Sequence, residues 1–238
     1  MKDIPVAIVT GGTRGIGRAV VEHLLADGWK VWFCGRSPKT VGQTLNDLDE
    51  FIDHLAGRVV DVTDYEAVDA LVEEVLEHEP HIDLLVNNAG VGYFAPVDEL
   101  TPDDWRRVLA TNLDGCFYAL HAVAPTMREQ GSGWIVNIAS LASRNPFAGG
   151  AAYNASKFGL LGMSEAAMLD LRGDGVKVVA ILPGSVATEF NLNTGGDDSW
   201  KLAADDVAKA VIDVLRYPDR ALPSRIELRP SRPPSAQS

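Results

Sequence analysis

The chain has 238 residues, of which 46% are hydrophobic and 23% are charged, and this length and composition fit one α/β domain. Its formal net charge of −12 argues against a nucleic acid partner, because an acidic surface repels phosphate backbones. There is no apolar run of the roughly 18 residues that a membrane span needs, and no signal-peptide core, so we expect a cytoplasmic protein without a membrane partner.

The cysteines and histidines give no sign of a cross-linked or metal-dependent fold. Cys34 and Cys116 form no CxxC pair, and the five histidines form no ligand motif. We therefore expect free thiols and no metal site.

Short runs rich in valine and isoleucine alternate with longer helical patterns along the chain. The runs predict strands at 6–10, 31–34, 58–62, 82–86, 134–138, 176–182 and, more weakly, 225–228. The patterns between them predict helices at 15–27, 65–78, 102–129, 153–172 and 203–216, with a less clear helix within 37–56. Several strands lack polar alternation, which is typical of a parallel sheet covered on both faces.

This alternation predicts a doubly wound parallel sheet of the Rossmann type in a single domain. The domain should span residues 1–229. Residues 230–238 are rich in proline and serine and contain no large apolar side chain, so they predict a disordered tail.

A glycine-rich segment, TGGTRGIG, follows the first strand and opens the first helix. Gly11, Gly15 and Gly17 let the backbone turn sharply and come close to a pyrophosphate, which the amino-terminal end of the helix would then bind. The spacing is GxxxGxG instead of GxGxxG, and a glycine cluster by itself also fits a plain tight turn. Its position between strand and helix favours dinucleotide binding.

The second strand ends in Gly35-Arg36-Ser37, where an NAD-specific site usually carries a carboxylate for the ribose hydroxyls. A guanidinium at Arg36 can instead bind a 2′-phosphate, and Arg14 can approach the same phosphate from the glycine-rich segment. The alternative is two solvated surface arginines. The missing acid together with two cations favours NADP(H) over NAD(H).

Several motifs occur together in a fixed order: TGGTRGIG at 10–17, NNAG at 87–90, Asn112, Ser140, Tyr153-xxx-Lys157 and Pro183-Gly184. In this combination the chain resembles the short-chain dehydrogenase/reductase family. More narrowly it is similar to the type of about 250 residues that includes ketoacyl-carrier-protein reductases and related carbonyl reductases. The resemblance covers residues 4 to 229.

The resemblance implies an oxidoreductase that moves a hydride between nicotinamide and a carbonyl or secondary alcohol, with Tyr153 as general acid and base. Lys157 lies one helical turn beyond Tyr153, so both side chains share a face, and its ammonium would favour the phenolate. Ser140 would polarise the substrate oxygen. In the family the residue at the Asn112 position interrupts a helix and holds a water that connects the lysine to solvent.

The resemblance also implies the remaining contacts to the cofactor. Asp61 and Val62 would flank the adenine, and Lys157 would bind the nicotinamide ribose. The cofactor-binding set is Gly11, Thr13, Arg14, Gly15, Ile16, Gly17, Arg36, Ser37, Asp61, Val62, Asn88, Ala89, Gly90, Tyr153, Lys157, Pro183, Gly184, Val186 and Thr188.

The substrate is not identified by the sequence beyond a small-molecule carbonyl or alcohol. Candidates for the pocket wall are aromatic, and each fits ordinary core equally well: Tyr93, Phe94, Phe147, Phe190 and Trp200. Arg128 and Arg172 could receive an acidic carrier protein, although the net charge opposes this. The helices at 102–129 and 153–172 resemble the pair that forms the family's four-helix interface, which predicts a homodimer or homotetramer.

Two other functions fit the same fold. One is a catalytically silent NADP(H)-sensing protein, against which the complete set of Asn112, Ser140, Tyr153 and Lys157 argues. The other is a sugar-nucleotide epimerase or dehydratase, but those relatives usually carry a larger carboxyl-terminal substrate region.

Overall fold

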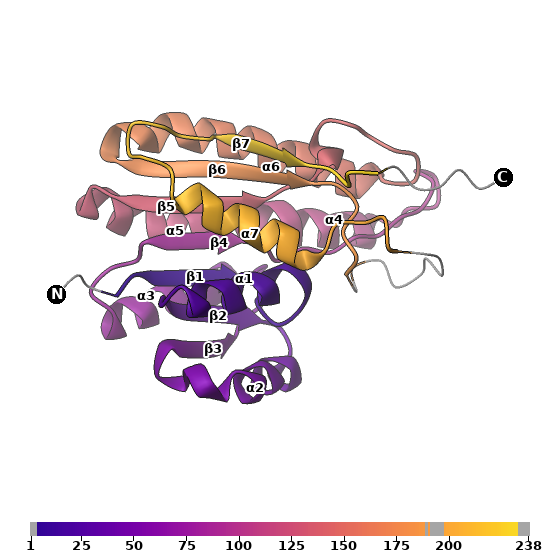
Figure 1. Cartoon of the computed structure of the whole chain (residues 1–238). Coiled ribbons are helices and arrows are strands. Elements are labelled where there is room, and N and C mark those ends of the chain that lie inside the picture. The colour runs from indigo at the N-terminus through magenta and orange to yellow at the C-terminus, as the bar shows by residue number, and fades with distance from the viewer. Residues whose placement is uncertain (1–3, 189, 191–197, 233–238) are drawn as a thin grey trace.

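Seven parallel strands form one sheet in the computed structural model, which describes residues 4–188, 190 and 198–232 (Figure 1). The order across the sheet is β3-β2-β1-β4-β5-β6-β7. The strands are β1 Val6–Thr10, β2 Lys30–Gly35, β3 Leu55–Val59, β4 Leu84–Asn87, β5 Gly133–Ile138, β6 Val176–Pro183 and β7 Arg225–Leu228. This is the doubly wound α/β architecture that the sequence predicts.

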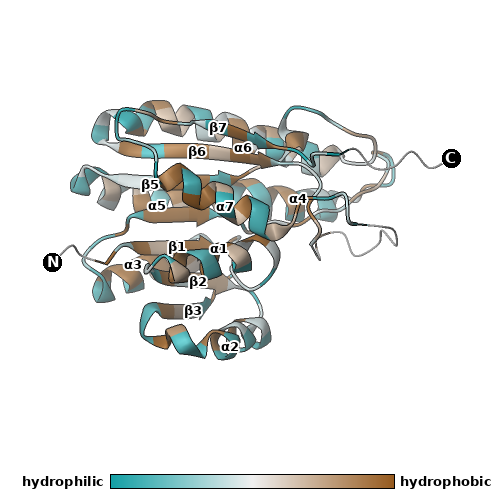
Figure 2. Cartoon of the chain, viewed as in Figure 1, coloured by the Kyte–Doolittle hydropathy of each residue, from teal (hydrophilic) through white to brown (hydrophobic). Residues whose placement is uncertain are grey.

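Helices cover both faces of the sheet, and each face has its own apolar core. The core on one face joins the sheet to α1, α2 and α7, and the core on the other joins it to α3, α5 and α6. Figure 2 shows mostly hydrophobic residues in the central strands and a mixture of hydrophobic and hydrophilic residues in the helices. The helices are α1 Gly15–Ala26, α2 Pro38–Asp47, α3 Tyr65–His78, α4 Pro102–Leu109, α5 Gly115–Gln130, α6 Ala151–Leu171 and α7 Ala204–Leu215.

The strand order reverses between β1 and β4, because β1 pairs with β2 on one side and with β4 on the other. In an open α/β sheet, such a reversal leaves a crevice beyond the carboxyl ends of the strands, and ligands bind there. The glycine-rich segment follows β1, and residues 88–90 follow β4, so both border this crevice.

The predicted single helix over 102–129 is wrong. Residues Ala110–Asp114 form a π-helical segment that separates α4 from α5. Asn112 lies in this segment, and its side-chain amide donates to the Val91 carbonyl oxygen at 2.9 Å while its oxygen accepts from the Val91 N–H at 2.8 Å. These bonds join the helix to the segment after β4, and π-helical bulges of this kind are common at functional sites.

The third strand also differs from its prediction at 58–62. It occupies Leu55–Val59, because its register is set by pairing with β2, from Val31 opposite Leu55 to Gly35 opposite Val59. β2 ends at Gly35, so the apolar residues Val60 and Val62 continue beyond the ladder. The unclear segment 37–56 contains α2 and a 3₁₀ turn at Asp49–His54 before β3 begins.

Two further expectations concern the chain as a whole. No helix among the described residues is long and apolar enough to cross a membrane. Of the predicted tail, residues 230–232 form neither helix nor strand, and residues 233–238 lie outside the described residues. The domain boundary at 229 stays a prediction.

Candidate active site

A cavity of about 730 Å³ lies at the carboxyl ends of the central strands, where the strand order reverses. Its volume is in the range of small-molecule and cofactor sites. Most of the predicted site residues line it: Gly11, Thr13, Arg14, Gly15, Ile16, Arg36, Ser37, Val62, Asn88, Ala89, Gly90, Ser140, Tyr153, Lys157, Pro183, Gly184, Val186 and Thr188.

The glycine-rich segment is packed too closely for side chains. A Cβ atom on Gly11 would lie 2.9 Å from Ala89 Cα, and one on Gly17 would collide with the Gly11 carbonyl oxygen and the Asn88 amide. Gly15 has φ +54°, a conformation that favours glycine. Asn88 fixes this segment by donating to the carbonyl oxygens of Thr10 and Gly11, each at 3.1 Å.

The amino-terminal end of α1 faces this cavity through Gly15 and Ile16. Its N-cap residue, Arg14, makes no side-chain capping bond, and the first turn contains no acidic residue. The backbone N–H groups of a first helical turn bind anions, especially where no side chain caps them. The residues present therefore fit the pyrophosphate of a dinucleotide.

The end of β2 borders the cavity without any carboxylate. Gly35, Arg36, Ser37 and Thr40 line this part, and Arg36 is exposed. A Cβ on Gly35 would lie 2.8 Å from the Thr13 Cγ2 methyl, so a larger residue there requires Thr13 to rotate. The Ser37 hydroxyl caps α2 by accepting from the Thr40 N–H at 3.4 Å.

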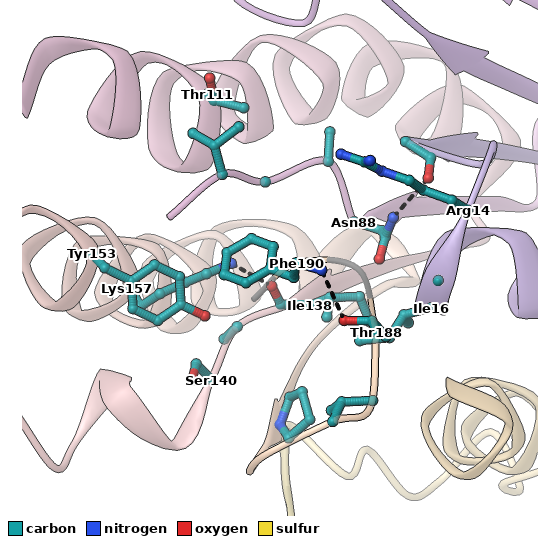
Figure 3. Close-up of a pocket in the computed structure, with 18 of the residues that line it drawn as sticks. Arg14, Ile16, Asn88, Thr111, Ile138, Ser140, Tyr153, Lys157, Thr188 and Phe190 are labelled. Carbon is teal, nitrogen blue, oxygen red and sulfur yellow. Dashed lines mark hydrogen bonds between the residues drawn. The ribbon is translucent and has the colours of Figure 1, made fainter. Parts of the chain in front are cut away.

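Tyr153, Ser140 and Lys157 come together at the other end of the cavity, as Figure 3 shows. Ser140 follows β5, whereas Tyr153 and Lys157 lie one turn apart on α6. The Tyr153 and Ser140 hydroxyls face the same space in this cavity. The Lys157 Nζ is 5.9 Å from the centroid of the Tyr153 ring and donates to the Ile138 carbonyl oxygen at 2.8 Å.

Burial has the largest effect on the pKa values of Tyr153 and Lys157. It raises the pKa of Tyr153, and the hydrogen bond from Ser140 opposes that rise. Burial likewise lowers the pKa of Lys157, which is 5% exposed. The expected lowering of the tyrosine pKa by Lys157 stays a prediction, because burial is the largest effect on Tyr153 in this structure.

Asn112 does not line the cavity and is fully buried. Besides its two bonds to Val91, its amide donates to the Ser156 hydroxyl at 3.1 Å, and Ser156 in turn donates to the Tyr153 carbonyl oxygen at 2.8 Å. Asn112 is therefore linked to α6 at the turn that carries Tyr153 and Lys157.

Two other predicted residues lie beside the cavity and do not line it. Gly17 packs against Gly11 and Asn88, and the Asp61 carboxylate accepts from the Thr63 N–H at 3.0 Å and from its hydroxyl at 2.9 Å. Of the aromatic candidates, Phe94, Phe147 and Phe190 line the cavity, whereas Tyr93 and Trp200 do not. The Tyr93 hydroxyl accepts instead from Arg107 at 2.7 Å.

Several lining residues were missed at the sequence level. Ile138 and Ala139 directly precede Ser140 at the end of β5, so the predicted end of this strand could have indicated both. Arg229 comes from the far end of the chain, where β7 pairs with β6, and no local pattern marks it. The others are Cys34, Thr40, Val60, Val91, Thr111, Leu141, Ala142, Asn145 and Ser185.

Among the described residues, no group of three or more histidine, cysteine, aspartate or glutamate side chains is placed to hold a metal ion. The two thiols are buried and unbridged, and burial raises the pKa of each to about 11.

The sequence and the structure are similar to those of characterised oxidoreductases. Residues 5–198 match the short chain dehydrogenase family model. Sulfoacetaldehyde reductase 2 of Chromohalobacter salexigens is 33% identical over 98% of this chain and 96% of its own length. Serine 3-dehydrogenase of Agrobacterium fabrum is 32% identical over 94% of this chain and 92% of its own.

Solved structures of oxidoreductases are also similar to this one. An alcohol dehydrogenase of Thermococcus sibiricus in complex with 5-hydroxy-NADP superposes with a TM-score of 0.89 at 27% identity, covering 97% of this chain and 99% of that one. A metagenomic short-chain oxidoreductase in complex with NADP superposes with a TM-score of 0.84 at 32% identity, covering 96% and 98%. The chain therefore belongs to the short-chain dehydrogenase family and is an NAD(P)-dependent oxidoreductase acting on CH–OH or C=O groups of small molecules.

Proposed function

We propose that this protein is an NADP(H)-dependent carbonyl reductase or alcohol dehydrogenase in which Tyr153 transfers the proton. The observation that carries the proposal is the meeting of the Tyr153 and Ser140 hydroxyls in the same cavity as the glycine-rich segment. A substrate oxygen between these two hydroxyls would also lie next to a dinucleotide bound along that cavity.

The bound nicotinamide supplies or accepts the hydride. Tyr153 gives its proton to the oxygen of the reduced carbonyl, or takes the proton of the alcohol in the reverse direction. Ser140 donates a hydrogen bond to the same oxygen as negative charge develops on it. Lys157 holds the ribose hydroxyls beside the nicotinamide, while its bond to Ile138 keeps the long side chain in place.

Asn112 acts through its neighbours, because it does not reach the cavity. Its amide connects Val91, which lines the cavity, with Ser156 between Tyr153 and Lys157. It therefore positions the turn of α6 that carries both reacting groups. A water held at this π-helical segment would connect Lys157 to solvent.

The preference for NADP(H) is supported by charge. The cavity wall at the end of β2 has a glycine where a carboxylate would repel a 2′-phosphate, followed by the exposed Arg36. The NADP complexes of two related structures agree with this assignment. The relatives' names do not give the substrate, because one acts on sulfoacetaldehyde and another on serine.

We also infer that the protein forms a homodimer or homotetramer and works in the cytoplasm. Large apolar side chains are exposed on α5 and α6, including Phe117 at 46% and Phe158 at 44%. Exposed side chains of this size are typical of a protein interface. The buried, unbridged cysteines agree with a reducing compartment.

Tyr153→Phe tests the catalytic assignment and also separates it from a sensing role. The variant should lose nearly all turnover of aldehydes and ketones while its NADPH affinity stays close to wild type, because the hydroxyl acts in chemistry and not in cofactor binding. If more than about a tenth of kcat/KM remained, a loss below ~1.4 kcal/mol of transition-state stabilisation, Tyr153 would not be the proton donor. Tight NADPH binding by the wild type without any turnover would instead favour the silent sensor.

A further inference from the structure

Three phenylalanine rings surround the ring of Tyr153. The ring centroids of Phe94, Phe190 and Phe147 lie 5.6, 5.8 and 6.4 Å from that of Tyr153, and Phe94 is 5.7 Å from Phe147. All three line the cavity, and Figure 3 shows Phe190 beside the tyrosine. We call Phe94, Phe147 and Phe190 the phenylalanine enclosure.

Two glycines make room for this enclosure. A Cβ on Gly92 would lie 2.7 Å from Phe94 Cζ and 2.9 Å from Phe190 Cε1. A Cβ on Gly150 would lie 2.6 Å from Phe147 Cε2. Neither glycine needs a positive φ, so what these positions require is space for the rings.

Hydrogen bonds hold in place the two loops that carry Phe94 and Phe147. Residues 91–97 after β4 meet residues 145–150 before α6 through an isolated bridge between Ala95 and Gly150. The Ala95 N–H donates to the Gly149 carbonyl oxygen at 2.9 Å, and the Asn154 amide donates to the Phe147 carbonyl oxygen at 3.2 Å. Phe94 and Phe147 are therefore fixed beside Tyr153 before a substrate arrives, which reduces the ordering cost of binding.

The phenylalanine enclosure is partly exposed to solvent. Phe94, Phe147 and Phe190 are exposed by 43%, 47% and 39%. Their gathered apolar surface is removed from water only when another apolar group lies against it, which is the main source of affinity in such pockets.

The positions of the charged side chains around the cavity also favour an uncharged substrate group at the enclosure. Arg14 and Arg36 belong to its glycine-rich end, and the Lys157 ammonium is hydrogen-bonded to Ile138. Arg229 pairs with Glu227 at 3.0 Å. Lys201 pairs with Asp198.

We propose that the substrate of this reductase carries an uncharged hydrophobic group, an aromatic ring or an alkyl chain of several carbons, that lies against Phe94, Phe147 and Phe190 while its carbonyl oxygen meets Tyr153. This inference rests on the proposed function and names the class of substrate for that site. Small anionic carbonyl compounds are then poor substrates, because they leave the enclosure in water, and the described cations that line the cavity lie at its glycine-rich end or bind Ile138 and Glu227.

Two pairs of aldehydes test this with NADPH: one pair differs in the length of its alkyl chain and the other in its charge, and the rate of each aldehyde with borohydride corrects for its intrinsic carbonyl reactivity. Hexanal should exceed propanal in kcat/KM by about 10- to 60-fold, since each of its three additional methylenes is worth up to roughly fourfold when buried. Methyl 4-formylbenzoate should exceed 4-formylbenzoate by about 10-fold or more, because the carboxylate must be desolvated at an apolar surface. Equal values within either pair, or a preference for the charged member, would overturn the inference.

Variants place the effect at the enclosure. Phe147→Ala should reduce the hexanal-to-propanal ratio by about fivefold or more, and Phe147→Leu should reduce it less, because leucine keeps an apolar surface. Tyr217→Ala is the matched control. The Tyr217 side chain is also aromatic and is 47% exposed, but it does not line the cavity. Its ratio should stay within about twofold of wild type. A ratio unchanged in Phe147→Ala, with cooperative unfolding retained, would contradict the assignment.

Binding measurements separate this inference from the proposed reaction. In Tyr153→Phe with NADP⁺ bound, calorimetric titration should give tighter binding of methyl 4-formylbenzoate than of 4-formylbenzoate, and Phe147→Ala should remove the difference. If the neutral aldehyde binds in this way but the wild type reduces none of the four aldehydes, the proposed reaction fails and the apolar specificity stands. If the wild type reduces aldehydes without either preference, the reaction stands and the specificity fails.

Discussion

The ammonium of Lys157 donates a 2.8 Å hydrogen bond to the carbonyl oxygen of Ile138, two residues before Ser140. This bond joins α6, which carries Tyr153, to the carboxyl end of β5, which Ser140 follows. Lys157 therefore links the two elements that supply these hydroxyls. Holding a buried ammonium there destabilises the fold, since desolvation disfavours its charged form.

Replacing Lys157 with methionine should expose this cost as a pH dependence of stability. The folded pKa of Lys157 lies below 10.5, so between the two pKa values the unfolded chain binds more protons than the folded one. The unfolding free energy of the lysine protein should therefore rise relative to that of the Lys157→Met protein as the pH increases toward 10.5. Urea denaturation at several pH values checks this, with Tyr153→Phe in both proteins to remove the phenol. A difference that is constant or falls between pH 7 and 10 would contradict it.

Ser140→Ala should shift the pH profile of the reaction upward. The hydrogen bond from Ser140 opposes the rise of the Tyr153 pKa that burial causes, so its loss raises that pKa further. Oxidation of an alcohol needs the phenolate and gains rate as the pH rises, so its rising limb should move to higher pH. Reduction needs the protonated phenol and should persist to higher pH. The profile of kcat/KM in both directions is the measurement, and a shift of either limb to lower pH would refute this account of Ser140.

Much of the fold and of the candidate site could be predicted because the signals are local. The order of apolar runs and the glycine-rich segment depend on neighbouring residues, and β1, α3 and β7 begin and end where the patterns predict. What was missed depends on distant pairings. The resemblance implies that Asn112 interrupts a helix, but the bonds that Asn112 makes to Val91 do not follow from a local pattern. Arg229 reaches the cavity because β7 pairs with β6. The space that Gly92 leaves for Phe94 and Phe190 also depends on the folding of the loops, so it cannot be predicted from the sequence.

The predicted oligomer can be tested at the exposed faces of α5 and α6. Phe158→Glu places a charge on an apolar side chain that is 44% exposed, so it should dissociate the assembly without disturbing the core. Light scattering at micromolar concentration should give a multiple of the 25.6 kDa chain mass for wild type and a lower mass for the variant. Leu76→Glu, at a residue that is 37% exposed on α3, is the control and should leave the mass unchanged. A monomeric wild type would end this proposal.

The cofactor preference is the most specific prediction, and the structure refines its test. Charge-assisted bonds from Arg36 to a 2′-phosphate are worth roughly 1.5–3 kcal/mol, so NADPH should bind about 10- to 150-fold more tightly than NADH. Solvent exposure and salt lower this value, and the preference should shrink as ionic strength rises. Arg36→Ala should remove most of the preference by weakening NADPH alone. Fluorescence titration of both cofactors at two salt concentrations measures it.

Reversing the preference requires a carboxylate at position 35, and the packing there sets the design. A Cβ on Gly35 would lie 2.8 Å from the Thr13 Cγ2 methyl, so Gly35→Asp by itself strains the glycine-rich segment. Thr13→Ser removes that methyl and keeps the hydroxyl. The triple variant Thr13→Ser, Gly35→Asp, Arg36→Ala should therefore bind NADH more tightly than NADPH, because the carboxylate accepts from the ribose hydroxyls and repels the phosphate. Thr13→Ser alone is the control and should keep the NADPH preference. Equal affinities of the wild type for both cofactors, or tighter NADH binding, would show that the end of β2 does not select the phosphate.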